Sequence, residues 1–269
     1  SIGVHLPKYT ELTLRIADAT PVMAELRDWF RKTNFTTSFY GVETPNKAAL
    51  EETDKRQNLR GDLSIAEKLK FISEQTGAGV LMGMIFGFDN DSDETVEEFI
   101  AFINETHVPI VMVGLLNALP ETKLMERLLK EGRFIQSSSC NNSDGVINFI
   151  PMNFSIQQAE KNYLRILRGI YAPAAYFKRV REHLQLFSTD YANKGRGRWE
   201  NTVTVVKILT GRHRKIFWQQ LPLAHHIARQ RYGFKGAGYG QLMTEFFSLC
   251  GQYSHFITQT ENLAVQLEQ

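Results

Sequence analysis

Four short segments in the first 150 residues carry the hydrophobic pattern of β-strands. Residues 12–16 and 38–42 alternate apolar and polar side chains, whereas residues 80–88 and 110–116 are nearly continuous apolar runs. Such runs are typical of strands buried on both faces of a parallel sheet. Segments with apolar residues at helical spacing separate the four, so the chain predicts βαβ units and an α/β fold. The pattern does not distinguish an open sheet from part of a barrel.

Signals for helix starts mark several predicted helices. Pro21 stands in the first turn of one helix, and residues 64–67 form a capping box that predicts a helix to about residue 75. A second capping box at residues 155–158 and the proline at position 173 predict two more helices. Further helices are expected beyond them, with a break around residues 233–240. The second half of the chain is therefore expected to be mainly helical.

The charge of the chain changes near residue 150. Residues 1–150 carry 15 Lys or Arg and 22 Asp or Glu, a net charge of −7, whereas residues 151–269 carry 16 and 7, a net charge of +9. Residues 146–150 are expected as a fifth strand that closes the α/β part. We therefore predict two domains, 1–150 and a basic helical domain, 151–269. The basic residues from 194 to 214 are similar to a phosphate or nucleic-acid footprint, with a solvated helix face as the alternative.

Several kinds of site are excluded by residue type and spacing. Two cysteines, Cys140 and Cys250, supply neither a disulfide framework nor a Cys-rich zinc site nor a self-contained iron–sulfur cluster. The aspartates at 89, 91 and 93 alternate as in a calcium loop, but the loop lacks its glycine and its final glutamate. No metal site is therefore predicted. The chain shows neither a signal peptide nor an apolar run of about 20 residues, so we expect a cytoplasmic protein without a transmembrane segment.

Polar residues at the carboxyl ends of the predicted strands are the first candidates for a binding site, because parallel sheets bind ligands there. This rule nominates Asp18, Glu43 with Thr44, residues 87–89 and residues 117–120. Glu43 is a candidate for meeting a ligand hydroxyl, with a surface carboxylate as the alternative. Glycines at 83 and 87 either let a flat ligand approach the backbone or let strand and helix pack closely.

Four motifs occur in a specific order along the chain. They are FYGVETPN at 39–46, KRQNL at 55–59, GMIFGFDND at 83–91 and VGLLNALP at 113–120. In combination they resemble the radical S-adenosylmethionine (SAM) proteins that carry a cobalamin-binding domain. Within these, the chain is similar to the subgroup with an extra helical C-terminal domain, which includes hopanoid methylases and Fe–S oxidoreductases. The resemblance covers residues 9–187 well and the remainder loosely.

The resemblance implies a partial TIM barrel of the (β/α)6 kind, of which this chain supplies strands three to six. The family's CxxxCxxC cluster loop follows its first strand, and that loop is not in this sequence. The chain is therefore expected to be the C-terminal part of a longer protein, followed by the helical domain. Two departures stand out: Thr10-Glu11-Leu12-Thr13 in place of Thr-Glu-Ala-Ser, and Pro120-Glu121-Thr122 in place of Pro-Gly-Thr, where a turn glycine is lost.

Carried over residue by residue, the resemblance nominates the positions that would contact SAM. Glu43 and Thr44 match the motif beside the ribose and amino-acid end, and Arg56 and Gln57 follow it toward the carboxylate. The remaining nominated positions are Gly83, Ile85, Gly87 and Asp89 at the adenine, Leu115, Leu116 and Asn117 on the sixth-strand side, and Glu11 at the third-strand end. No catalytic residue is assigned.

In the whole protein the resemblance implies a [4Fe–4S] cluster that reduces SAM to a 5′-deoxyadenosyl radical, which abstracts hydrogen from a small-molecule or lipid-like substrate. Cobalamin in the missing N-terminal half is the expected methyl carrier if the reaction is a methylation. The chain alone is expected to be inactive, and no nucleic-acid partner is expected. The alternative is a non-catalytic binding module whose basic helical region holds an anionic partner.

Overall fold

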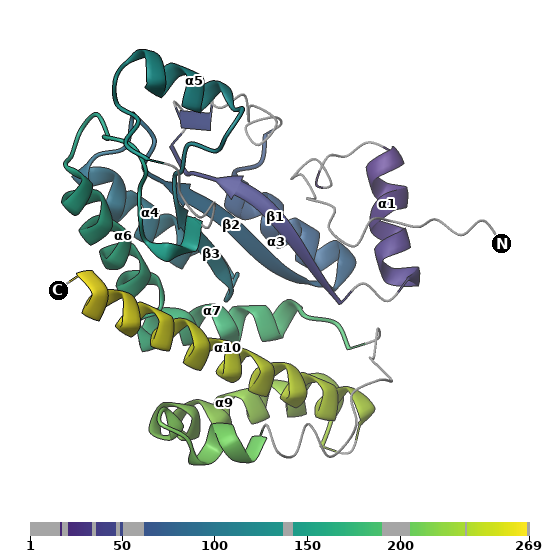
Figure 1. The fold of residues 1–269 in the computed structure, drawn as a ribbon. Helices are drawn as coiled ribbons and strands as arrows, with labels where there is room; N and C mark the ends of the chain where they lie inside the picture. The colour runs from purple at the N-terminus through teal and green to yellow at the C-terminus, as the bar shows by residue number, and fades with distance from the viewer. Residues whose placement is uncertain are drawn as a thin grey trace.

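The computed structural model describes residues 17, 21–33, 36–46, 49–50, 62–136, 142–189, 205–234 and 236–267. Within them, three parallel strands form an open sheet, and a mainly helical region follows (Figure 1). The strands lie side by side in the order β1 (Thr37–Glu43), β2 (Gly79–Phe86) and β3 (Val111–Leu115). These confirm three of the four predicted strands. The segment at 12–16, predicted as a further strand, lies outside the described residues.

The helices alternate with the strands and then follow one another. Their bounds are α1 (Pro21–Lys32), α3 (Ile65–Thr76), α4 (Asp93–Glu105), α5 (Lys123–Lys130), α6 (Ile156–Ile170), α7 (Pro173–Leu186), α9 (Arg214–Tyr232) and α10 (Ala237–Leu267), with a 3-10 turn, η3 (Asn142–Asp144). The predicted break around 233–240 is confirmed by the end of α9 and the start of α10.

The predicted capping boxes differ in outcome. At the start of α3, Glu67 N–H donates to Ser64 Oγ at 3.2 Å and Ser64 N–H donates to the Glu67 carboxylate at 2.7 Å, so this box is complete. At the start of α6, Ser155 Oγ accepts from Gln158 N–H, but the Gln158 side chain donates to Asn162 at 2.9 Å instead of returning to the cap. The second prediction is therefore right about the helix start and wrong about the reciprocal bond.

Residues 146–150 do not form the fifth strand that the sequence predicted. Phe149 makes a single antiparallel bridge with Phe134, and Ile150 N–H donates to the carbonyl of Arg133 at 2.8 Å. Phe149 is buried in a small hydrophobic cluster with Leu128 of α5. Ile147 and Phe149 pack in this cluster beneath α5, whereas Val146 and Ile150 are exposed, and the segment does not pair with β3.

One continuous hydrophobic core joins the sheet to the helical region. On one face of the sheet, Phe86 meets Phe99 of α4 edge-on, with ring centroids 6.0 Å apart. The same core continues through Tyr163 of α6 and Phe177 of α7 to Phe246 of α10. In Figure 1, α5 lies above the sheet and α10 below it. The boundary at residue 150 stays a prediction, since the two parts share this core.

A fully buried arginine fixes the junction between the α/β part and the helices. Arg179 of α7 donates from Nε to the carbonyl of Val108 at 2.9 Å, from Nη1 to Asn104 Oδ1 at 2.5 Å and from Nη2 to the carbonyl of Ile170 at 2.7 Å. Burial lowers the pKa of Arg179 to about 10. The guanidinium therefore remains charged at neutral pH, and its hydrogen bonds compensate for the lost water.

Candidate functional site

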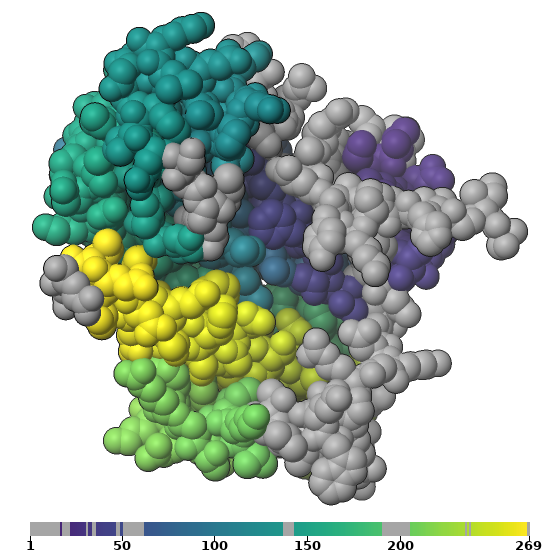
Figure 2. All heavy atoms as spheres, viewed as in Figure 1, coloured from purple at the N-terminus to yellow at the C-terminus, as the bar shows by residue number. Residues whose placement is uncertain are grey.

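The sheet has one covered face and one open face. Tyr40, Met82 and Phe86 point into the core beneath the helices and are fully buried. Neighbouring side chains on a strand point to opposite faces, so Phe39, Leu81, Gly83, Ile85 and Met112 share the other face, where they are only partly buried or exposed. We call these five residues the open face. Figure 2 shows residues of the sheet, in purple and blue, at the bottom of a hollow above α10, in yellow.

The carboxyl end of β1 is a strained turn centred on Glu43. Thr44 N–H donates to the carbonyl of Val42 at 3.0 Å, and Glu43 between them has a φ of 69°. This is a γ-turn of the rare, strained kind, and strain at a non-glycine residue is often found at functional sites. Thr44 is fully buried and its Oγ1 accepts from Asn46 N–H at 3.1 Å. The turn therefore fixes the backbone position from which the Glu43 side chain projects.

Different features of the structure explain the glycines at positions 83 and 87. A Cβ on Gly83 would lie 2.5 Å from Cζ of Phe39, so the Phe39 ring occupies the space over this glycine. Gly87 has a φ of 111°, a conformation that other residues rarely adopt. Its N–H donates to Asp91 Oδ2 at 2.8 Å. Packing accounts for Gly83, and the turn after β2 accounts for Gly87.

Asp89, nominated at the adenine, is ion-paired within the chain. Its carboxylate lies 2.8 Å from Arg127 Nη2 and 2.5 Å from Arg133 Nη2. The hydrogen bond to Asp89 raises the pKa of Arg133 above its ordinary value. Asp91 is fully buried and instead organises the loop, because its Oδ2 accepts from the N–H groups of Gly87 and Phe88. The carboxylate that shapes the end of β2 is thus Asp91.

The carboxyl end of β3 holds a buried amide with an unused acceptor. Asn117 exposes only 5% of its surface, and its Nδ2 donates to the carbonyls of Leu115 at 3.2 Å and Val146 at 3.1 Å. Its Oδ1 has no hydrogen-bond partner among the described residues. Leu115 points into the covered face beside Phe86, and Leu116 packs in the small cluster under α5. Of the three nominated residues here, Asn117 is the one with a polar side chain.

The altered turn at Pro120-Glu121-Thr122 keeps the backbone of a glycine. Glu121 has a φ of 61°, in the left-handed region that glycine occupies without strain. Glu121 therefore stands in a backbone conformation that a glycine adopts without strain. Thr122 caps α5 by accepting from Met125 N–H at 3.3 Å.

Strand topology brings the described candidates to one edge of the sheet. Gly41 is opposite Gly83, and Ile85 is opposite Gly114. Glu43 ends β1, and Gly87 and Asn117 follow β2 and β3, so all three lie at the carboxyl ends of the parallel strands. Glu11, Asp18, Arg56, Gln57 and Cys140 lie outside the described residues. The placement of Glu11, Asp18, Arg56 and Gln57 near the strand ends stays a prediction.

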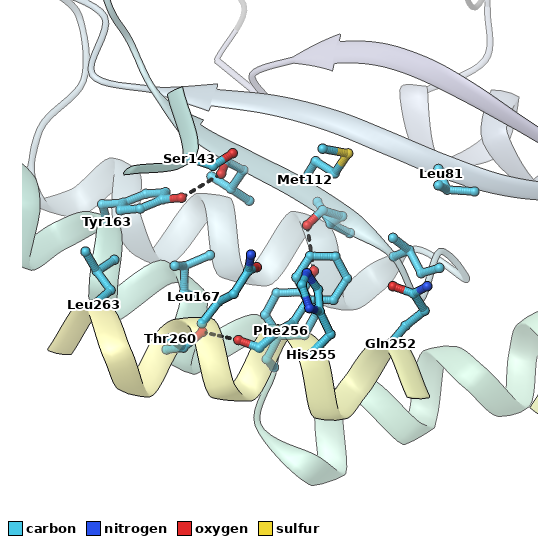
Figure 3. A pocket seen from close by; sticks show the side chains of 15 residues that line it. Leu81, Met112, Ser143, Tyr163, Leu167, Gln252, His255, Phe256, Thr260 and Leu263 are labelled. Carbon is cyan, nitrogen blue, oxygen red and sulfur yellow. Dashed lines mark hydrogen bonds between the residues drawn. The ribbon is translucent and has the colours of Figure 1, made fainter. Parts of the chain in front are cut away.

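A pocket of about 330 Å³ adjoins the open face at the β3 edge. Leu81 and Met112 form its sheet side, and Leu167 of α6 with Phe256 and Leu263 of α10 forms its other walls (Figure 3). Polar groups at its rim come from Gln252, His255 and Gln259 of α10 and from Ser143 of η3. The pocket is thus mostly apolar with a few polar groups, as small-molecule sites commonly are.

The pocket and the predicted strand-end site are parts of one surface. Met112 lines the pocket and is the register partner of Gly83, and Leu81 precedes Gly83 by two residues on the same face. Residues two apart on a strand are about 7 Å apart. Leu81 and Met112 stand in the first halves of β2 and β3, six residues before Gly87 and five before Asn117. About 16–20 Å along the strands therefore separates the pocket from the strand carboxyl ends, on the same face of the sheet.

Two tyrosines of α6 and its C-terminal cap close the outer edge of β3. Tyr163 donates to the carbonyl of Val113 at 2.8 Å, and Tyr171 donates to the carbonyl of Val111 at 2.7 Å (Figure 3). Burial raises the pKa of both phenols, so they remain protonated donors at neutral pH. An unpaired strand edge would otherwise expose these acceptors. The helical region thus covers the free edge of β3.

Several residues that shape this region were not nominated from the sequence. Phe39 lies within a recognised motif but was not singled out, and Asp91 was considered only as a calcium ligand. Arg127 and Arg133 carry no motif, and long-range ion pairs leave no periodic signal. No cluster of three metal-ligating side chains occurs in the part of the chain that the structure describes. No described helix is long and apolar enough to cross a membrane.

Comparisons with known proteins find a matching family model and two similar proteins. The family model described as "Domain of unknown function (DUF4070)" matches residues 122–269. The chain is similar to "Hopanoid C-2 methylase" of Rhodopseudomonas palustris (strain TIE-1), with 32% identity over 177 residues, or 66% of this chain and 31% of the relative. It is also similar to an uncharacterized methyltransferase of Synechocystis sp., with 32% identity over 171 residues, or 63% of this chain and 30% of the relative.

The similarity covers only part of each relative. The chain spans about a third of the length of these two relatives, at 31% and 30%. No solved structure matches the chain.

Proposed function

The chain belongs to the DUF4070 family of domains of unknown function, and on this premise we propose that it forms the C-terminal part of a radical SAM enzyme of the methylase type. The similarity to a hopanoid C-2 methylase and to a second methyltransferase supports the methylase class. The proposal assigns the three strands to the last part of a (β/α)6 barrel. The observation that carries it is the open face of the sheet, which runs from the carboxyl ends of the strands to an apolar pocket beside the first halves of β2 and β3.

The residues at the strand ends fit SAM. Glu43 offers a carboxylate to ribose or amino-acid hydrogen-bond donors, and its strained turn holds the backbone in place. Asn117 offers a buried acceptor that has no partner among the described residues. Ile85 and Phe39 offer apolar surface to the adenine. Bound SAM would supply hydrogen abstraction or methyl-group chemistry, which these side chains orient and shield from water.

The residues of this chain do not fit a [4Fe–4S] cluster. Cys250 is fully buried within the core, and burial raises the pKa of its thiol, which disfavours the thiolate that binds iron. Cys140 lies outside the described residues, and two cysteines are too few for three cluster ligands. We propose that the cluster, and cobalamin if it is used, belong to a preceding part of a longer protein. Consequently we expect no activity from this chain alone.

The pocket at the β3 edge suits an apolar substrate. Leu81, Met112 and Phe256 offer hydrocarbon surface, and Gln252 and His255 at the rim offer hydrogen bonds to a small number of polar groups. The one substrate named among the relatives is a hopanoid, which is a lipid. We propose a lipid-like or other largely apolar small molecule as the substrate class.

A titration of SAM into the full-length, cluster-bearing protein tests the proposal. Glu43→Gln and Arg56→Ala should each weaken SAM binding at least tenfold, because loss of one charge-assisted partner costs about 2–3 kcal/mol. Glu126→Gln on the exposed surface of α5 is the matched control and should leave the affinity unchanged. Circular dichroism checks that each variant is folded. Unchanged affinity in both site variants would overturn the proposal and favour the non-catalytic binding module.

A further inference from the structure

A long basic stretch without acidic residues includes α9. Residues 201–244 contain seven Lys or Arg and no Asp or Glu, although the chain as a whole has 29 acidic residues. Figure 2 shows α9, in light green, on the side of α10 that faces away from the sheet. The stretch therefore carries positive charge with no carboxylate of its own, and α9 lies apart from the candidate site.

One side of α9 collects exposed cationic and apolar side chains. An α-helix turns about 100° per residue, so Lys215, Trp218, Pro222, His226 and Arg229 fall within one quarter of its circumference. All five are exposed. We call these five residues the α9 face. A helix face of this composition differs from the opposite side of α9, which packs into the hydrophobic core.

The cations of the α9 face are available to a partner. Neither Lys215 nor Arg229 forms an ion pair within the described part of the chain. Nearby arginines are engaged instead: Arg212 lies 2.7 Å from a carboxylate oxygen of Glu261, and Arg231 donates to two backbone carbonyls near the end of α7. Surface arginines near α9 thus have internal roles, and the α9 face retains the free charge.

The aromatic residues beside these cations are held in exposed positions. Trp218 is 53% exposed, and its indole N–H donates to the carbonyl of Leu209 at 3.2 Å, which fixes the ring against the preceding helical residues. Phe234, just beyond α9, is 64% exposed and packs edge-on against His225. Ordering these rings before binding reduces the entropy that binding would cost.

We propose that the α9 face docks onto the anionic headgroup surface of a lipid bilayer. Helices that lie on membranes combine Lys and Arg with Trp and other apolar side chains, and Trp is enriched at the membrane–water interface. Each Lys or Arg near an anionic surface contributes attraction, and no carboxylate in the stretch opposes it. A nucleic acid or the acidic half of a second copy would use the charge but not the exposed Trp218 and Pro222 together. The proposal is independent of the function proposed above.

Flotation with vesicles tests the proposal. The purified chain is mixed with vesicles of phosphatidylcholine containing 30% phosphatidylglycerol, or of phosphatidylcholine alone, at 0.1 M salt. We expect a partition coefficient at least tenfold higher for the anionic vesicles, with release at 0.5 M salt. Lys215→Glu with Arg229→Glu should lower it by more than tenfold. The matched control, Lys123→Glu with Lys130→Glu on exposed positions of α5, should change it less than twofold.

A second readout distinguishes insertion from simple charge attraction. In a variant with Trp29→Phe and Trp199→Phe, Trp218 is the remaining tryptophan, and brominated lipids should quench its emission. Equal binding to neutral vesicles, no quenching, or equal loss in the α5 control would overturn the proposal. Binding to a mixed-sequence single-stranded RNA but not to vesicles would also overturn it. So would a dimer, seen in sedimentation velocity and abolished by the α9 substitutions, in a chain that does not bind vesicles. If the charge reversals unfold the chain, Lys215→Gln with Arg229→Gln replaces them.

Discussion

Buried polar side chains lie at both ends of the three-stranded sheet, but their surroundings differ. At the end where the strands begin, Arg179 donates to the carbonyls of Val108 and Ile170 and to Asn104 Oδ1, at 2.9, 2.7 and 2.5 Å. At the carboxyl end, Asn117 Oδ1 has no partner among the described residues and Glu43 holds a strained turn. Unpaired and strained groups are tolerated where a ligand gains from them. A buried hydroxyl without a hydrogen-bond partner in the described part of the chain also occurs at Ser38 near the start of β1, so the strained turn at Glu43 is the clearer difference between the two ends. We propose that the end with Arg179 stabilises the fold and that the end with Glu43 binds the ligand.

The largest expected effect concerns Arg179 at the stabilising end. Arg179→Met should lower the free energy of unfolding by about 3–5 kcal/mol, because buried acceptors lose their donor without access to water. Urea denaturation followed by circular dichroism measures this.

The matched control is Arg165→Met. Arg165 pairs with Glu97 where both side chains are more than half exposed, so its removal should cost less than about 1 kcal/mol. Equal effects of the two substitutions would contradict a stabilising role for the buried network.

A smaller effect is expected from acid at the same end. His107 is buried, with its Nε2 2.7 Å from Ser73 Oγ, and burial lowers its pKa to about 3. The unfolded chain takes up this proton near pH 6.5 and the folded chain does not, so stability is lost as the pH falls between 6.5 and 3. Between pH 7 and 5 this group should lower the free energy of unfolding by about 2 kcal/mol.

His107→Gln removes the titrating group. The loss of unfolding free energy between pH 7 and pH 5 should therefore be about 2 kcal/mol smaller in this variant. His226→Gln, on the exposed surface of α9, is the matched control and should leave it unchanged. Urea denaturation at pH 7 and pH 5 distinguishes these outcomes. An unaltered pH dependence in His107→Gln would mean that the stabilising end is not sensitive to acid through this residue.

Local signals were enough to predict most elements of the fold. The Ser64 capping box and Pro173 act within one or two turns of a helix, and the apolar runs of β2 and β3 follow from burial within a parallel sheet. The error at residues 146–150 has a physical cause. Apolar side chains there pack beneath α5, and a short apolar run does not reveal whether its backbone pairs with a strand.

The candidate site was predictable only in part. Glu43, Gly87 and Asn117 were nominated because strand ends meet at one edge, and the structure places all three there. Asp89 is engaged by Arg127 and Arg133, which come from distant positions and could not be paired with it in advance. Long-range partners of this kind, and the closure of β3 by Tyr163, depend on tertiary packing that no local pattern records.

Hydrogen exchange in the full-length protein, with and without SAM, tests whether the strand carboxyl ends bind SAM. SAM should slow amide exchange in peptides covering residues 39–46, 83–91 and 113–118, and leave residues 104–110 and 176–183 unchanged. Glu43→Gln should remove most of this slowing at the same SAM concentration. Slowing that is absent from the strand carboxyl ends, or equal at both ends of the sheet, would contradict the assignment of this edge as the ligand-binding end.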